Sequence, residues 1–269
     1  MMKEAIFQFN KDDVKKEDVI ASLAKYGIAV IHNYVDQSRL EKLRVESLDL
    51  LEVETKDRLQ IDESAMQRLP LKDLNTEKYF TISSLSNDEI FEHVTKDFFH
   101  PYSYTLENIY IHRDVNKMAF NAVWHIDPVI TVKFYVYLND VDKTNGAFMY
   151  NLGSHREGYY RLMYKRHTGD NHPTFGIPDE EILNAVNIEA KAGSMVIFNP
   201  IGTHSAGQIE EGKERQVIRY HYTTIQPKSK FKRLTYRLWR TKLNPVRYYG
   251  SRDEYYNIKH KSQDYHVEE

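Results

Sequence analysis

The sequence contains no cysteine, and this absence excludes several kinds of functional site. Disulfides, thiolate zinc sites, iron–sulfur clusters and cysteine nucleophiles are ruled out, so any metal must be held by histidine and carboxylate side chains. The sequence also lacks an apolar run of the roughly 20 residues that a membrane helix needs. Its first residues, MMKEAIFQFNKDD, lack the apolar core of a signal peptide, so we expect a cytoplasmic protein.

Charge is distributed unevenly along the 269 residues, although the net charge is only −2. Residues 226–252 carry nine Lys and Arg and no acid, which leaves an acidic remainder. We expect residues 1–225 to form the main domain and residues 226–269 to form a basic, aromatic C-terminal extension packed on it. Peripheral contact with an anionic membrane is the less favoured alternative, and no nucleic-acid partner is expected because no known reading motif is present.

The N-terminal part of the chain predicts helices. Residues 17–26 place their apolar side chains on one helical face, and Gly27 is a C-terminal stop signal. Residues 28–32 (IAVIH) predict a short strand, after which Asp36 or Ser38 can cap a second helix.

From about residue 105 the pattern changes to short β-rich runs separated by turn residues. These runs are residues 108–112, 129–138, 147–151, 186–190, 194–198 and 216–224. One short helix is expected from Pro178, whereas residues 53–80 show no clear pattern. We therefore predict a mainly β fold with flanking helices, either a sandwich or a barrel.

A candidate metal site begins at the segment WHID (124–127), at the entry to the longest β-run. Residues i and i+2 of a strand share a face, so His125 and Asp127 would present an imidazole and a carboxylate side by side. His204, after a distant strand, is the candidate third ligand. Two histidines and one carboxylate leave three positions of an octahedron open, which suits non-haem Fe(II) that must bind a co-substrate and O₂ together.

The spacing alone is a weak signal, because 12 histidines and 18 aspartates predict about one His-x-Asp by chance. Three other segments have the same spacing of a histidine and an acid: His112/Asp114, His155/Glu157 and His266/Glu268. We expect His112 to run into a turn with no strand continuing from it. Only His125 and Asp127 lead into a long strand and are followed by a second histidine and an arginine. The alternative is that His125 and His204 are hydrogen-bonded core histidines.

That arginine is Arg215, 11 residues after His204 at the start of a predicted strand. A guanidinium binds a carboxylate through two parallel hydrogen bonds and is always charged. Arg215 could therefore hold the far carboxylate of a dicarboxylic co-substrate whose other end chelates the metal. Arg219 lies on the same face of the strand and is the competitor, and either arginine could instead pair with an acidic neighbour.

The order of these motifs resembles the phytanoyl-CoA dioxygenase-like branch of the Fe(II)/2-oxoglutarate-dependent oxygenases. The resemblance covers about residues 15–225, and its matching segments are YGIAVIHNYVDQSRLEKLR (26–44), WHID (124–127), NGAFMYNLGSHR (145–156), AGSMVIFNPIGTH (192–204) and Arg215. It implies a double-stranded β-helix, a jelly-roll, cupin-like barrel with the metal at one mouth. It also implies His125, Asp127 and His204 as iron ligands and Arg215 as the 2-oxoglutarate anchor.

The resemblance implies, further, a dioxygenase that hydroxylates a small molecule with O₂ and releases succinate and CO₂. Tyr135 corresponds to an aromatic residue near the co-substrate, although Tyr137 has the same strand parity. Ala206 stands where many relatives have a serine that contacts 2-oxoglutarate, so we assign that contact to Ser205. Ser194 replaces a usual aspartate, which we interpret as a turn variation. Asp127 is retained, which favours hydroxylation over halogenation.

The sequence does not select a substrate. Residues 155–176 are basic and aromatic and predict either a lid over the barrel mouth for a polar, anionic or sugar-like molecule, or a solvated loop. For the chain as a whole, the alternatives are a cupin-type metal-dependent isomerase or hydrolase that does not use 2-oxoglutarate, and a non-catalytic binding barrel.

Overall fold

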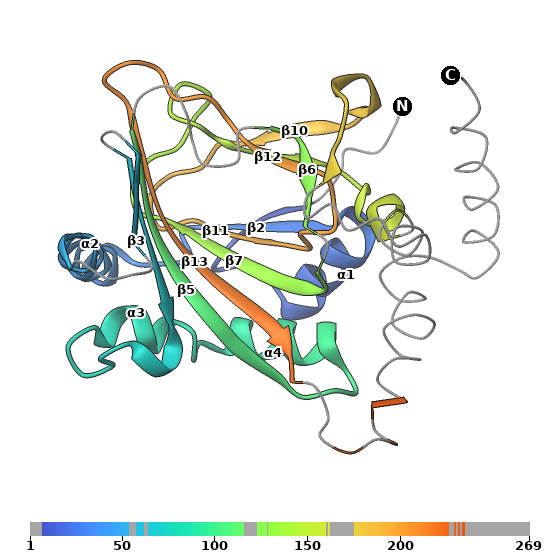
Figure 1. The fold of residues 1–269 in the computed structure, drawn as a ribbon, viewed down its shortest axis with the longest axis horizontal. Coiled ribbons are helices and arrows are strands. Elements are labelled where there is room, and N and C mark those ends of the chain that lie inside the picture. The colour runs from blue at the N-terminus through green and yellow to red at the C-terminus, as the bar shows by residue number, and fades with distance from the viewer. Residues whose placement is uncertain are drawn as a thin grey trace.

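Two β-sheets face each other in the computed structural model, which describes residues 7–53, 58–61, 64–115, 123–127, 129–159, 161, 175–225, 229, 231 and 233–234. Among these residues the larger sheet has eight strands, in the order β1-β2-β11-β7-β13-β5-β4-β3, and the smaller has five, in the order β10-β8-β12-β6-β9. Figure 1 shows the smaller sheet above the larger one and helices α3 and α4 below it. This two-layer arrangement confirms the predicted jelly-roll, cupin-like class. The two sheets form a sandwich and do not close into a barrel.

The larger sheet consists of β1 (Gln8–Asn10), β2 (Ile28–His32), β3 (Arg58–Ile61), β4 (Ser64–Pro70), β5 (Tyr104–Val115), β7 (Thr131–Tyr137), β11 (Met195–Phe198) and β13 (Glu214–Thr224). The smaller sheet consists of β6 (His125–Ile126), β8 (Phe148–Asn151), β9 (Phe175–Gly176), β10 (Ala185–Ile188) and β12 (His204–Ala206). The helices are α1 (Lys16–Tyr26), α2 (Gln37–Glu52), α3 (Phe80–Leu85) and α4 (Glu89–Phe99), with short 3-10 turns η1 (Leu71–Asp73) and η2 (Asp179–Glu181).

The predicted N-terminal elements are confirmed. Helix α1 ends at Gly27, which adopts φ 81° and donates its backbone N–H to the carbonyl of Leu23. Strand β2 follows at once, and Asp36 then caps α2 by accepting a hydrogen bond from the backbone N–H of Arg39. The local signals suffice here because capping and helix termination depend on neighbouring residues.

Strand alternation divides the side chains of the larger sheet between two environments. On the outer face, Phe134 of β7 stacks on Phe91 of α4 at 4.3 Å between ring centroids, and Tyr220 of β13 meets the same ring edge-on at 5.2 Å. On the inner face, Tyr135 packs against Phe148 of the smaller sheet. The space between the sheets is therefore lined by alternate residues of β7 and β13, and this is the surface that positions the candidate site.

Three expectations need correction. Strand β5 continues past residue 112 to Val115, because β13 pairs with it from Thr224 back to Glu214, so His112 does not run into a turn. The helix expected from Pro178 is reduced to the single turn η2, since β10 begins at Ala185. Residues 53–80, where no pattern was evident, supply β3, β4 and η1 at the edge of the larger sheet.

Two expectations fall largely outside the described residues: the C-terminal extension (226–269) and the lid (155–176). They stay predictions, as does the division into domains. Within the part of the chain that the structure describes, no helix combines the length and the apolar character required to cross a bilayer.

Candidate metal centre

The structure brings His125, Asp127 and His204 together at one edge of the space between the sheets. His125 in β6 and His204 in β12 are paired in register, and their rings lie 4.3 Å apart between centroids. Asp127 follows β6, where its backbone N–H donates to the carbonyl of Pro200 at 2.8 Å. One ligand atom from each of the three side chains lies within 4.8 Å of the other two. The predicted trio is thus spatially convergent.

Backbone carbonyls fix the orientation of both imidazoles. Nδ1 of His125 lies 2.7 Å from the carbonyl oxygen of Val123, and Nδ1 of His204 lies 2.8 Å from that of Gly202. Because a carbonyl only accepts, each Nδ1 must carry the hydrogen, which leaves the Nε2 lone pair for a metal.

The donor spacing tests whether the trio fits an ion. Nε2 of His125 lies 3.9 Å from Oδ1 of Asp127. Donors in adjacent positions around an ion at about 2.1 Å lie about 3 Å apart, so small side-chain rotations bring the trio onto one ion. Two imidazoles and one carboxylate with further positions open fit a divalent ion such as Fe(II).

The protonation states also match those that metal binding requires. Burial by itself raises the pKa of Asp127, but the Lys133 ammonium, which donates a hydrogen bond to Oδ2 of Asp127, more than compensates and holds that pKa well below its ordinary value. Burial lowers the pKa of His204 to about 3, although the carboxylate of Asp127 acts in the opposite direction. At neutral pH the aspartate is therefore ionised and His204 is neutral, the forms that bind a metal ion.

A wall of basic and aromatic side chains on β7 and β13 faces the trio. Lys133 and Tyr135 of β7 pair in register with His221 and Arg219 of β13. The guanidinium carbon of Arg219 lies 4.6 Å from the centroid of the Tyr135 ring. Burial, and then the charges of Lys133 and Arg219, hold the pKa of His221 well below its usual range, so this histidine is neutral.

Arg215, the predicted co-substrate anchor, is occupied by other groups. Its Nη2 and Nε donate to Oδ2 of Asp114 at 2.7 and 3.2 Å, and its Nη1 donates to the carbonyl of Gly146. The arginine is 2% exposed and the aspartate 0%. This arrangement corresponds to the alternative in which the arginine pairs with an acidic neighbour, and the anchoring role stays a prediction.

The remaining predicted contacts differ in their surroundings. Tyr135 faces the space between the sheets and also packs edge-on against Phe198, whereas Tyr137 donates its hydroxyl hydrogen to the carbonyl of Ile188. Ser205 donates to the carbonyl of Ala206, and strand alternation directs its side chain away from the face that carries His204. The roles of Tyr135 and Ser205 toward a co-substrate stay predictions.

Two of the three competing histidine motifs lie in the described residues and neither joins the trio, whereas His266/Glu268 lies outside the described residues. His112 is buried in β5, where its Nδ1 lies 4.0 Å from Oδ1 of Asp114. His155 is also buried, and its Nε2 lies 3.2 Å from the carbonyl oxygen of Ala24. Neither belongs to the group of three clustered donors.

Two residues of this region were not singled out from the sequence, Lys133 and His221, and Asp114 was considered only as the acid of the competing His112 motif. A usable signal exists for both. Lys133 is the one charged residue in the run VITVKFYVYL, and a charge inside a buried strand indicates a buried partner. His221 lies two positions from Arg219 and therefore shares its face.

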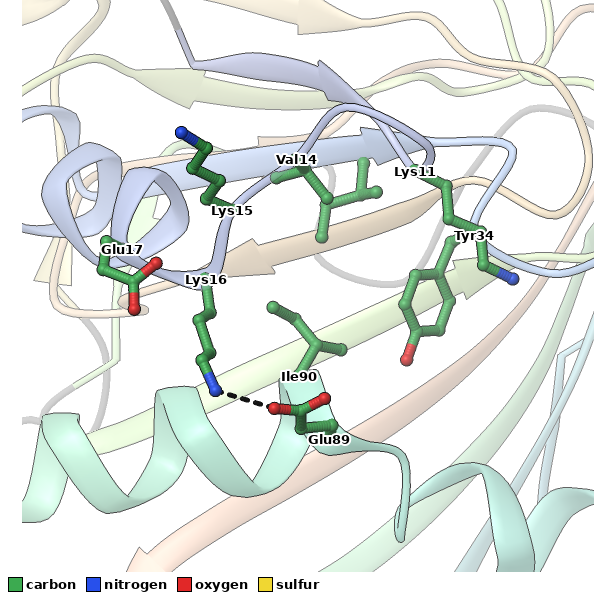
Figure 2. A pocket seen from close by; sticks show the side chains of 9 residues that line it. Lys11, Val14, Lys15, Lys16, Glu17, Tyr34, Glu89 and Ile90 are labelled. Atoms are coloured by element: carbon green, nitrogen blue, oxygen red, sulfur yellow. Dashed lines mark hydrogen bonds and ion pairs between the residues drawn. The ribbon is translucent and has the colours of Figure 1, made fainter.

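A separate hollow of about 470 Å³ lies between the start of α1 and α4 (Figure 2). Lys16 and Glu89 form an ion pair of 2.7 Å across it, and Lys11 and Lys15 also line it. None of its lining residues belongs to the metal centre, so it plays no part in the chemistry considered below.

Comparison with known proteins indicates a family and a fold. A family model described as phytanoyl-CoA dioxygenase (PhyH) matches residues 72–217. A search of curated proteins finds no match.

Several solved structures share the fold. The non-heme alpha ketoglutarate dependent epimerase SnoN from nogalamycin biosynthesis is 19% identical over 81% of this chain and 88% of its own, with a TM-score of 0.59. HygX from Streptomyces hygroscopicus, solved with nickel and 2-oxoglutarate, is 16% identical over 82% of this chain and 94% of its own, with a TM-score of 0.53. EctD from S. alaskensis, solved with 2-oxoglutarate and 5-hydroxyectoine, is 14% identical over 79% of this chain and 77% of its own, with a TM-score of 0.57.

Proposed function

The chain belongs to the phytanoyl-CoA dioxygenase family of iron- and 2-oxoglutarate-dependent enzymes, and from this premise we propose that it hydroxylates a polar small molecule with O₂, releasing succinate and CO₂. Bound iron and 2-oxoglutarate supply the oxidising chemistry of such a reaction, and the protein supplies binding, orientation and electrostatics. We place the reaction in the cytoplasm, as the sequence predicts.

The observation that carries the proposal is the convergence of two imidazoles and one carboxylate. The Nδ1 contacts leave Nε2 of His125 and His204 available to a metal, and Asp127 adds a carboxylate that stays ionised at neutral pH. Three protein ligands leave room for a chelating co-substrate and for O₂ on the same ion. The alternative of two hydrogen-bonded core histidines does not account for the third donor, Asp127, beside them.

The charge of the inner wall supports an anionic co-substrate. Lys133, Arg215 and Arg219 are buried on this face, and among the described residues Asp127 contacts Lys133 and Asp114 contacts Arg215. Adding a divalent cation makes the space more positive. A dicarboxylate such as 2-oxoglutarate offsets that charge, because burying an uncompensated charge is costly.

Anaerobic binding tests the first half of the proposal. Purified protein is titrated with Fe(II) and then with 2-oxoglutarate, and binding is followed by calorimetry and by the visible absorbance of the complex. Asp127→Ala should lose metal binding, whereas Asp12→Ala, which removes an exposed carboxylate elsewhere, should retain it. Failure of the unaltered protein to bind 2-oxoglutarate in an Fe(II)-dependent way would reject the proposal.

Turnover tests the second half. A library of polar metabolites is screened for compounds that stimulate succinate release, and the products are analysed by mass spectrometry and chiral chromatography. Hydroxylation adds one oxygen atom to the product. A product of unchanged mass and inverted configuration would replace hydroxylation by epimerisation, the activity in the description of SnoN. Product without succinate would favour a cupin-type isomerase or hydrolase.

A further inference from the structure

We propose that Arg68 and Tyr110 bind an oxyanion of the substrate, a carboxylate or phosphate group that lies away from the reacting carbon. This inference rests on the proposed function, because it names the substrate class of the same site: an elongated small molecule with an anionic group at one end. Its basis is a row of side chains that leads from the metal centre across the inner face of the larger sheet to strand β4.

The row begins beside the metal centre. Lys133 of β7 donates a hydrogen bond to Oδ2 of Asp127, and the strand register pairs Lys133 with His221 of β13. The ring of Tyr135, two residues along β7, lies nearly parallel to the imidazole of His221, at 6.4 Å between centroids. His221 is therefore the point at which the row leaves the metal centre.

Tyr110 continues the row onto β5. Its ring centroid lies 4.5 Å from that of His221, so the two rings are in direct contact. Its neighbours Ile109 and Ile111 belong to the apolar cluster on the outer face, so strand alternation directs Tyr110 to the inner face. Tyr110 is half-buried, and part of its surface is therefore accessible to a ligand.

Arg68 ends the row on β4. It pairs in register with Tyr110, and residues opposite each other on neighbouring strands share a face. Its Nε donates to Oδ1 of Asn108 at 3.1 Å, and Asn108 is buried, so one edge of the guanidinium is held in place. A guanidinium has five N–H donors and this bond uses one of them. Because Arg68 is an exposed residue, a ligand can approach it from solvent.

The charges around Tyr110 favour an anion. Burial raises the pKa of Tyr110, the positive charges of Arg68 and Lys133 lower it, and the exposed carboxylate of Glu107 has a smaller, opposite effect. The phenol stays protonated at neutral pH and can donate its hydrogen to an oxyanion. A ligand oxyanion here would thus meet one hydroxyl donor and a dominant positive charge, whereas a cation would be repelled.

The length of the row sets the shape of the substrate. Strands β7, β13, β5 and β4 are consecutive in the larger sheet. Neighbouring strands lie about 4.8 Å apart, so β4 lies about 14 Å from β7, which faces the metal trio. An oxyanion at Arg68 and Tyr110 is therefore remote from the metal and from a co-substrate chelated there. The part of the substrate between the two ends crosses the rings of Tyr110 and His221.

Phenyl phosphate, benzoate and benzamide are suitable probes of this subsite, because they share one ring and differ in charge. Full-length protein loaded anaerobically with Fe(II) and 2-oxoglutarate is titrated with each probe, and binding is measured by calorimetry. The unaltered protein should bind at least one of the two anions and should bind neutral benzamide about tenfold more weakly or less. The anion that binds more tightly identifies the group, phosphate or carboxylate, that the substrate carries.

Variants assign the binding to the named residues. Arg68→Gln should weaken binding of the preferred anion about tenfold or more, as expected for the loss of a charged hydrogen-bonding partner, and should leave the affinity for 2-oxoglutarate unchanged. Tyr110→Phe removes one hydroxyl and should give a smaller loss. Arg113→Met is the matched control, because Arg113 is ion-paired with Glu214 on the other face of β5, and this variant should bind the anion like the unaltered protein.

Circular dichroism and thermal melting establish that each variant is folded before its affinity is interpreted, and Arg68→Lys, which keeps the charge, replaces Arg68→Gln if the latter does not fold. Equal binding of the anion by the Arg68 variant and the unaltered protein would show that the inference is wrong while the function stands. The same conclusion follows if benzamide binds as tightly as the anions or if neither anion binds. If the unaltered protein does not bind 2-oxoglutarate with Fe(II), the proposed function itself fails.

Discussion

Replacing Arg215 by methionine is expected to destabilise the protein strongly, because it leaves a buried carboxylate without its cation. Asp114 is 0% exposed and accepts two hydrogen bonds from this arginine, at 2.7 and 3.2 Å. Methionine fills a similar length but donates no hydrogen bond. The substitution therefore also deprives the carbonyl of Gly146 of its side-chain donor.

The magnitude follows from the asymmetry between breaking an ion pair and replacing it. Removing one partner of a buried pair costs about 3–5 kcal/mol. This is a large part of the roughly 5–15 kcal/mol that stabilises a typical domain. Removing both partners, as in Asp114→Leu/Arg215→Met, exchanges the pair for apolar packing and should restore stability to within about 1–2 kcal/mol of the unaltered protein.

Urea unfolding followed by circular dichroism measures these differences at one pH. The single variant should unfold at much lower urea than the unaltered protein, and the double variant should recover most of the loss. A single variant that loses less than about 1 kcal/mol would show that the pair is not as desolvated as described. A double variant as unstable as the single one would place the loss in the contact with Gly146.

Lys133 places a positive charge against Asp127, which opposes the binding of a cation at that carboxylate. Lys133→Met is therefore expected to raise the affinity for Fe(II) about tenfold or more, measured in competition with a chelator. An unchanged affinity would contradict this. Burial and two nearby arginines hold the pKa of His112 well below its usual value. The part of the unfolding free energy that depends on neutral His112 is therefore fully present above about pH 6.5 and is lost as the pH falls. His112→Leu should therefore flatten the decline in unfolding free energy between about pH 7.5 and pH 5, and an equally steep decline would assign it to other groups. At Gly27, φ is 81° and an added Cβ would lie 2.3 Å from the hydroxyl oxygen of Tyr150. Gly27→Ala should therefore lower the unfolding free energy by about 2 kcal/mol or more. An unchanged melting temperature would contradict the clash.

The metal trio illustrates how much of a site a sequence can predict. His125 and Asp127 belong to one segment, so strand alternation alone places their side chains together. His204 lies far along the chain, and its position depends on the order of motifs that the family resemblance provides. The structure bears out the convergence of all three.

The choice between the two arginines shows where such reasoning stops. Arg215 and Arg219 have the same strand parity, so alternation cannot distinguish them. The difference lies in Asp114, which β5 brings across from Arg215. A prediction that ends this strand near residue 112 removes Asp114 from the sheet. A non-local pairing of this kind depends on the lengths of two strands, and boundaries are the least reliable part of a sequence-based assignment.

The strands that carry the metal-binding histidines are paired over a much shorter length than the strands that carry the arginines. Strands β5 and β13 are 12 and 11 residues long, whereas β6 and β12 have two and three residues and meet through the single pair His125–His204. An ion bound by these histidines would cross-link two chain segments that share almost no other ladder. Occupancy by the metal would then hold β6 against β12, while β12 stays paired with β8 and the arginines stay on the long strands with or without it.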